Sequence, residues 1–121
     1  MNLQQRKRAE DPLTDSATLE RLAADRDAGV RWRVARHRAT PAAALQRLAA
    51  DPDMGVRLAV AKHPSTPAAV LERLAADRVA FVRFLVAHHH AIPPAALERL
   101  AADPEPIVWR AAGAEVARRQ A

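Results

Sequence analysis

The stretch VRWRVARHR, residues 30–38, concentrates arginine around one tryptophan. Guanidinium groups bind phosphates and carboxylates through parallel hydrogen bonds. A tryptophan beside them can stack on a nucleobase or anchor a protein interface. Trp32 with Arg33, Arg36 and Arg38 could therefore form a phosphate-binding site for nucleic acid or a binding site for another protein.

The rest of the composition offers little for catalysis. Cysteine and tyrosine are absent, which excludes disulfides, cysteine-ligated zinc and iron–sulfur clusters. Serine occurs only at Ser16 and Ser65, and no glycine-rich phosphate loop is present, so we expect a protein that is not an enzyme and has no cofactor.

No apolar run approaches the roughly 20 residues of a membrane span, and the first residues lack the apolar stretch of a secretory signal, so we expect a cytoplasmic location.

The net charge of +5 comes from the two ends of the chain. Between Ala9 and Trp109, 13 basic residues balance 13 acidic ones. The surplus is carried by Arg6, Lys7, Arg8, Arg110, Arg118 and Arg119, offset by Glu115. We interpret these residues as solvated terminal segments rather than as one binding stripe.

An eight-residue motif recurs four times with a constant period. TLERLAAD, ALQRLAAD, VLERLAAD and ALERLAAD begin at positions 18, 44, 70 and 96, each 26 residues after the one before. The period defines one repeat domain at 14–117, with units at 14–39, 40–65, 66–91 and 92–117. Residues 1–13 are expected to form a basic tail and partial cap, and residues 118–121 a basic tail. A fixed period of this length predicts units that pack against their neighbours.

Each unit reads as two short helices. Thr40 and Pro41 should open the first helix, the threonine as a cap and the proline in the first turn. Asp27 and Asp53 are placed to cap second helices. Helices of about three turns are marginal alone in water, so stacking must stabilise them. Frequent alanine and an aromatic content of only 3% favour an all-α solenoid over a sheet protein.

The pattern LxxLAxDxxxxVRxxVAxHPxTP over residues 45–67 resembles the leucine-rich repeat variant family, which is similar to the HEAT-like class. The resemblance implies a right-handed, all-α superhelix of two-helix repeats in which α-helical and 3₁₀-helical segments alternate. The iron–sulfur module of some members is not expected, because cysteine is absent. Members commonly have asparagine where this chain has His37, His63 and His89, which we interpret as turn residues bonded to backbone. The pattern is carried by Leu45, Leu48, Ala49, Asp51, Val56, Arg57, Val60, Ala61, His63, Pro64, Thr66 and Pro67.

The same resemblance implies a structural ladder, because HEAT-like repeats place an aspartate six residues before an arginine. A guanidinium between stacked units can satisfy carboxylates and turn carbonyls. In the fourth unit Trp109 replaces the arginine, which predicts that the ladder ends there. The expected pairs are Asp25 with Arg31, Asp51 with Arg57, and Asp77 with Arg83.

The second helices should display a strip that repeats from unit to unit. With about 100° per residue and Val30 at zero, Trp32, Arg33 and Arg36 span about 200° to 300°, away from the packing side. Stacking aligns them with their equivalents into an apolar column beside a basic one, which predicts a protein-binding or scaffold surface. The alternative is that Trp32 and Phe84 are buried as core. The candidate partner-binding residues are Trp32, Arg33, Arg36, Leu58, Lys62, Phe84 and His88.

Binding of nucleic acid through the first unit and the basic ends is the alternative function. The four units carry charges of +2, +1, +1 and −2, whereas a protein that follows a phosphate backbone needs positive charge along its path.

The run at His88–His90 suggests a metal, but consecutive helical residues diverge by about 100°, and zinc needs three or four converging ligands. We therefore expect a monomer that binds a protein or an acidic peptide segment, with no metal and no membrane partner.

Overall fold

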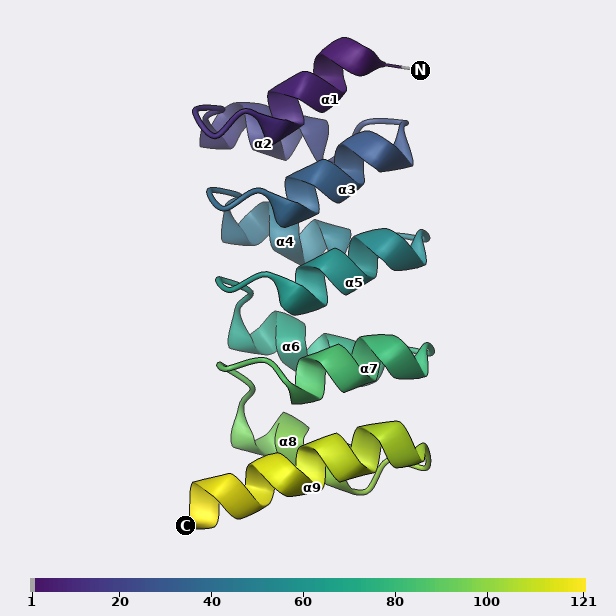
Figure 1. Cartoon of the computed structure of the whole chain (residues 1–121). Helices are drawn as coiled ribbons and strands as arrows, with labels where there is room; N and C mark the ends of the chain where they lie inside the picture. The colour runs from purple at the N-terminus through teal and green to yellow at the C-terminus, as the bar shows by residue number, and fades with distance from the viewer. Residues whose placement is uncertain (1) are drawn as a thin grey trace.

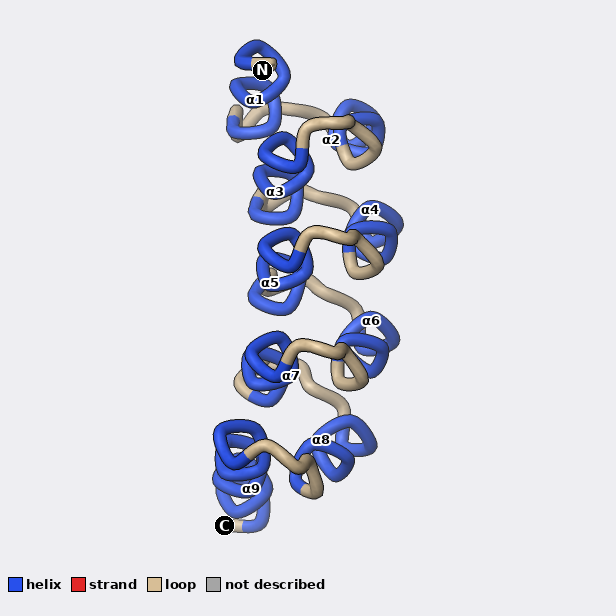
Figure 2. The backbone as a smooth tube through the Cα atoms, turned by 90° about the vertical axis from the view of Figure 1, so that its right-hand side faces the viewer, coloured by secondary structure: helices blue, strands red, loops and turns tan. Residues whose placement is uncertain are grey.

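The computed structural model describes residues 2–121, and all regular structure within them is α-helical. The helices stack along one direction (Figure 1) and form two layers (Figure 2). The odd layer contains α1, α3, α5, α7 and α9, and the even layer contains α2, α4, α6 and α8. The predicted all-α solenoid of two-helix repeats is confirmed. The helices are α1 (Leu3–Glu10), α2 (Ser16–Leu22), α3 (Ala28–Arg36), α4 (Ala42–Leu48), α5 (Met54–Lys62), α6 (Ala68–Leu74), α7 (Ala80–Ala87), α8 (Pro94–Ala101) and α9 (Pro106–Gln120).

The core is a continuous line of small apolar side chains between the two layers. Leucines of the even layer, such as Leu45 and Leu71, and valines of the odd layer, such as Val56 and Val82, are fully buried. Alanines such as Ala61 are also buried and let neighbouring helices approach closely. Because contacts join each helix to its neighbours in the stack, the fold is stabilised one interface at a time.

The helix starts agree with the predicted caps at α3 and α5 and differ from the predicted cap at α4. Asp27 accepts the Gly29 N–H and Asp53 accepts the Val56 N–H, as predicted for caps. The prediction that Thr40 caps α4 is wrong, because Pro41 is the cap residue and has an extended backbone. The Thr40 hydroxyl instead donates to the Val34 carbonyl at 2.6 Å, which also accepts the His37 N–H at the end of α3.

The alternation of α and 3₁₀ segments implied by the resemblance is wrong for residues 2–121, where both helices of every repeat are α-helices. Bonds from an N–H to the carbonyl three residues earlier occur at helix ends, as from His37 to Val34 and from His63 to Val60. The helices contain from 7 to 15 residues, whereas 3₁₀ geometry seldom continues beyond about four.

Arginines bridge neighbouring repeats, but their carboxylate partners differ from the predicted ones. Arg31 Nε donates to Asp51 Oδ2 in the next repeat at 2.7 Å, and its Nη1 donates to the Asp25 carbonyl at 2.8 Å. The Asp25 carboxylate is engaged elsewhere, because its Oδ1 accepts the Asp27 N–H. The predicted pairing of Arg31 with the carboxylate six residues earlier is therefore wrong, and the aspartate twenty residues later takes that role.

The same bridge recurs at Arg57 with Asp77 and at Arg83 with Asp103. Asp103 is thus the last carboxylate of the ladder, although Trp109 follows it instead of an arginine. Hydrogen bonds to their aspartates raise the pKa of Arg31 and of Arg83. Burial acts to raise the pKa of Asp103, but hydrogen bonds from Arg83 and from the Glu105 N–H outweigh it and hold the pKa below its usual value.

Histidines form a second ladder through the turns. The Nε2 atoms of His37, His63 and His89 each lie 2.7 Å from a backbone carbonyl one repeat earlier. Their Nδ1 atoms each accept the N–H of the residue two positions later, at 3.0 Å. A ring that accepts at Nδ1 and donates at Nε2 is a neutral imidazole. The bond within each turn, which Nδ1 accepts, therefore requires an uncharged ring, whereas the bond between turns requires only a proton on Nε2.

The terminal helices extend the odd layer at both ends. α1 packs against α3, and Arg6 pairs with Asp27 at 2.8 Å. The hydrogen bonds from Arg6 lower the pKa of Asp27 to about 2. At the other end α9 continues to Gln120, and Arg119 donates to the Ile92 carbonyl at 3.0 Å. The segments expected as basic tails thus include helical turns that contact the rest of the stack.

Removing the central ladder arginine should destabilise the protein strongly. The side chains of Arg57 and Asp77 are 4% and 7% exposed, so Arg57→Ala would leave a buried carboxylate without its partner. We expect the free energy of unfolding to fall by about 3–5 kcal/mol, measured by urea unfolding followed by far-ultraviolet circular dichroism. Arg47→Ala, on the exposed side of α4, is the control and should change it by less than about 0.5 kcal/mol. A loss below about 1 kcal/mol for Arg57→Ala would contradict the role of the ladder.

The histidine ladder should make stability depend on pH. Burial lowers the pKa of His89, so the unfolded chain binds this proton before the folded chain does. The free energy of unfolding should therefore decrease as the pH falls below about 6.5. We expect His89→Asn to show a smaller decrease than the wild type between about pH 7 and about pH 5 in urea titrations. Parallel curves for the two proteins would show that His89 does not carry this dependence.

Candidate protein-binding surface

The predicted strip lies on one face of the odd layer as two lines of side chains. Trp32, Leu58 and Phe84 are half-buried and pack against the core; we call them the apolar column. Arg36, Lys62 and His88 are exposed; we call them the basic column. Within each column the members lie one repeat apart, so the stack determines their spacing. The rings of Trp32 and Phe84 are therefore not fully buried core.

Two adjoining hollows lie on this face. Their volumes, about 830 Å³ for the first hollow and about 590 Å³ for the second hollow, are in the range of about 300–1,000 Å³ found for ligand clefts. Trp32 and Arg36 line both hollows, so one extended ligand could occupy both. The first hollow is lined by Ala9, Glu10, Pro12, Trp32, Arg33, Arg36, His37, Arg38 and Ala39. The second hollow is lined by Trp32, Ala35, Arg36, Gly55, Leu58, Ala59, Lys62, His63, Pro64, Phe81 and Leu85.

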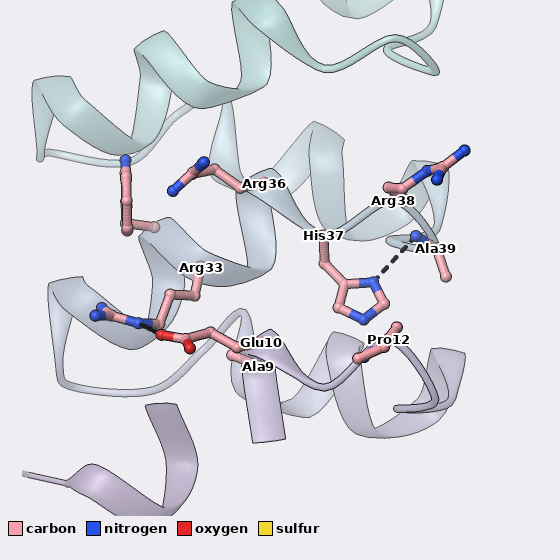
Figure 3. A pocket seen from close by; sticks show the side chains of 9 residues that line it. Ala9, Glu10, Pro12, Arg33, Arg36, His37, Arg38 and Ala39 are labelled. Carbon is pink, nitrogen blue, oxygen red and sulfur yellow. Dashed lines mark hydrogen bonds and ion pairs between the residues drawn. The ribbon is translucent and has the colours of Figure 1, made fainter. Parts of the chain in front are cut away.

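The arginines of the first hollow differ in how they are bonded (Figure 3). Arg33 forms an ion pair with Glu10 of α1 and also donates to the Gly29 carbonyl. Both Arg33 and Arg36 lie over the Trp32 ring, and Arg36 is the nearer, with its Cζ 4.5 Å from the ring centroid against 5.4 Å for Arg33. Arg38 points away from Arg33 and Arg36 in Figure 3. Arg36 takes part in none of the ion pairs found within residues 2–121, so its guanidinium retains donors for a ligand.

Phe81 lines the second hollow, and the sequence analysis did not identify it. Its side chain is 48% exposed, and its ring stacks on Phe84 with the centroids 5.6 Å apart. Phe81 lies in the first turn of α7, at about 260° in the helical projection used for the strip. This angle is in the middle of the selected range, so the helical period could have revealed the residue.

Gly55 holds the position in α5 that Phe81 holds in α7, and it keeps the second hollow open. A Cβ at Gly55 would lie 3.0 Å from Oδ1 of Asp53, the cap residue of α5, and 4.0 Å from Trp32 Cδ1. The absence of a side chain thus leaves room between Trp32 and Leu58. Sequence periodicity could not identify this role, because a glycine in a helix has several explanations.

The structure brings together five of the seven predicted partner-binding residues. Phe84 and His88 are outside the lining of both hollows. Phe84 lies against Phe81, and the His88 ring meets the edge of Phe84 at a centroid distance of 4.6 Å. The candidate surface is therefore centred on α3 and α5 and reaches α7 through Phe81. The five residues are Trp32, Arg33, Arg36, Leu58 and Lys62.

His88–His90 do not converge on a common point. His89 belongs to the histidine ladder, and its ring stacks on His90 with the centroids 4.7 Å apart. Among residues 2–121, no group of three histidine, cysteine, aspartate or glutamate side chains could hold a metal ion.

None of the helices in the described part of the chain combines the length and the apolar character that a membrane crossing requires.

Comparison with known families matches two consecutive segments of the solenoid. The family model described as leucine rich repeat variant matches residues 55–79 and 80–105. Residues 55–105, less than half of the chain, are therefore similar to leucine-rich repeat variant repeats. Such repeats are HEAT-like helical repeats, generally involved in protein interaction and typically non-catalytic. No curated protein and no solved structure matches the chain.

The segment that matches the family model contains both framework and surface residues. It includes the ladder residues Arg57, Asp77 and Asp103, and it includes Leu58 and Phe81 of the second hollow. Trp32 and Arg36 precede it, in a unit that has the same 26-residue period. The match therefore accounts for the repeat framework, whereas the hollows depend on the side chains that this chain places on it.

Proposed function

We propose that the chain is a non-catalytic protein-binding module whose partner occupies the two hollows of the odd layer. The observation that carries this proposal is the wall shared by the hollows, in which the exposed Arg36 covers the half-buried ring of Trp32. A ring already held against the core loses little conformational freedom on binding, and a guanidinium can form two hydrogen bonds to one carboxylate. Tryptophan and arginine are enriched among the residues that dominate binding at protein interfaces.

The second hollow supplies apolar surface for a partner side chain. Leu58, Phe81 and Leu85 line it, and Phe81 is 48% exposed. Burying a large apolar side chain contributes about 1.5–3 kcal/mol. A partner residue of this kind would cover Phe81 and exclude water around Arg36, which strengthens charged hydrogen bonds there.

The bonding of the arginines favours a protein over nucleic acid as the partner. Arg6 pairs with Asp27, Arg33 pairs with Glu10, and Arg118 and Arg119 both pair with Glu115. These four arginines are part of the set that suggests phosphate binding, which also includes Arg36 and Arg38 of the first unit. Because attraction to a phosphate backbone depends on cations that are not already neutralised, their pairing weakens that alternative.

The acidic side chains support a binding role rather than catalysis. Asp51, Asp77 and Asp103 accept bonds from the ladder arginines. Glu10, the carboxylate that lines the first hollow, is paired with Arg33. A general acid or base needs a carboxyl group that can exchange its proton within reach of a substrate, and these groups are held in structural bonds.

The test compares proteins captured from a native lysate by the wild type and by the double variant Arg36→Ala/Phe81→Ala. Both side chains are exposed, so the variant should keep its helicity, which circular dichroism would verify. We expect the wild type to retain a protein at high salt and after nuclease treatment, and the variant to retain at least about tenfold less of it. Quantitative mass spectrometry measures the difference.

Ile107→Ala/Arg110→Ala is the matched control for this experiment. Ile107 holds in α9 the position of Phe81 in α7, and both side chains are 48% exposed. Arg110→Ala removes one positive charge, as Arg36→Ala does, and neither control residue lines a hollow. The control should retain the captured protein. Equal losses in the two variants would contradict the assignment to the hollows, and capture that disappears with nuclease treatment would support the nucleic-acid alternative.

A further inference from the structure

The basic column indicates the chemical character of the partner segment. Arg36 and Lys62 are exposed at the rim of the second hollow, one repeat apart. Neither takes part in the ion pairs found within residues 2–121. Unpaired cations beside an apolar hollow complement a ligand that combines carboxylates with an apolar side chain.

We propose that the partner segment is an acidic peptide in the polyproline II conformation, with two carboxylates three residues apart and one large apolar side chain between them. This inference rests on the proposed function and adds the chemistry and the spacing of the ligand. Arg36 binds one carboxylate and Lys62 binds the other. The apolar side chain enters the second hollow against Leu58 and Phe81.

The repeat spacing determines the spacing of the carboxylates. α3 and α5 are neighbours in the odd layer, and packed helices lie about 8–10 Å apart. Arg36 and Lys62 hold equivalent positions in these helices, so their offset is of that order. Polyproline II has three residues per turn and a rise of about 3.1 Å, which places equivalent side chains about 9 Å apart. Same-face neighbours in a β-strand, about 6.6 Å apart, are too close.

The faces of the peptide also match the two columns. Successive side chains of polyproline II point about 120° apart, so the helix presents three faces. One face places its carboxylates on the basic column, and the adjacent face points the intermediate side chain toward the apolar column. Gly55 leaves the floor of the second hollow open to receive it. The third face is directed to solvent and can carry proline.

Synthetic peptides of different spacing test this inference on the full chain. The chain has two tryptophans, so Trp109→Phe leaves Trp32 as the fluorescent reporter of both hollows. The test peptide contains Glu-Leu-Pro-Glu between flanking prolines, because a proline biases the preceding residue toward an extended conformation. Peptides with Glu-Leu-Glu-Pro and Glu-Leu-Pro-Pro-Glu have the same charge and different spacing. We expect the three-residue spacing to bind at least about tenfold more tightly than either control.

Variants of the basic column connect each carboxylate to its cation. In Arg36→Ala, replacing one of the two glutamates by glutamine should cause no further loss of affinity, while replacing the other should still weaken binding. Lys62→Ala should show the reverse assignment. Arg110→Ala, which removes the same charge outside the hollows, should bind the test peptide like the parent protein.

Equal affinity for the three spacings would overturn the proposed conformation, and binding unaffected by Arg36→Ala and Lys62→Ala would overturn the proposed site. If none of the peptides binds but protein capture still depends on Arg36 and Phe81, the inference fails and the proposed function stands. If capture does not depend on them either, the proposed function fails as well.

Discussion

Arg31, Arg57 and Arg83 each connect two repeats through one planar guanidinium, and the geometry of the stack depends on these bridges. Each donates Nε to an aspartate of the following repeat and Nη1 to a turn carbonyl of its own repeat. The same aspartates accept a backbone N–H two residues later. Each arginine therefore determines the position of the next repeat and the shape of the turn between the two helices of its own repeat.

The arginine ladder compensates for what the apolar core cannot specify. The core consists mainly of alanine, valine and leucine, and the burial of such apolar side chains has no preferred direction. Hydrogen bonds do have one, because they fail when donor and acceptor shift. The histidine ladder acts in the same way at the other ends of the helices, where each ring bonds to backbone in two consecutive repeats.

Once the two ladders and the core hold the stack, the remaining positions of the odd layer can vary. Gly55, Phe81 and Ile107 occupy the same position in three successive repeats, and the second hollow is lined by a glycine at α5 and by a phenylalanine at α7. Arg36 and Lys62 likewise belong to none of the ion pairs found within residues 2–121. A repeat framework thus keeps its stability while individual side chains form a surface of particular shape and charge.

The sequence by itself determined the period, the helices, the buried leucines and valines, the aspartate caps of α3 and α5 and the two columns, because these features depend on spacing along a few turns of chain. Tertiary structure decided which charged side chains form ion pairs with one another. Stacking brings Asp51 beside Arg31 and Glu10 beside Arg33, across separations that carry no local pattern. It also decided that Phe81 lines the hollow while Phe84 supports it, since the lining of a hollow depends on how neighbouring helices are placed.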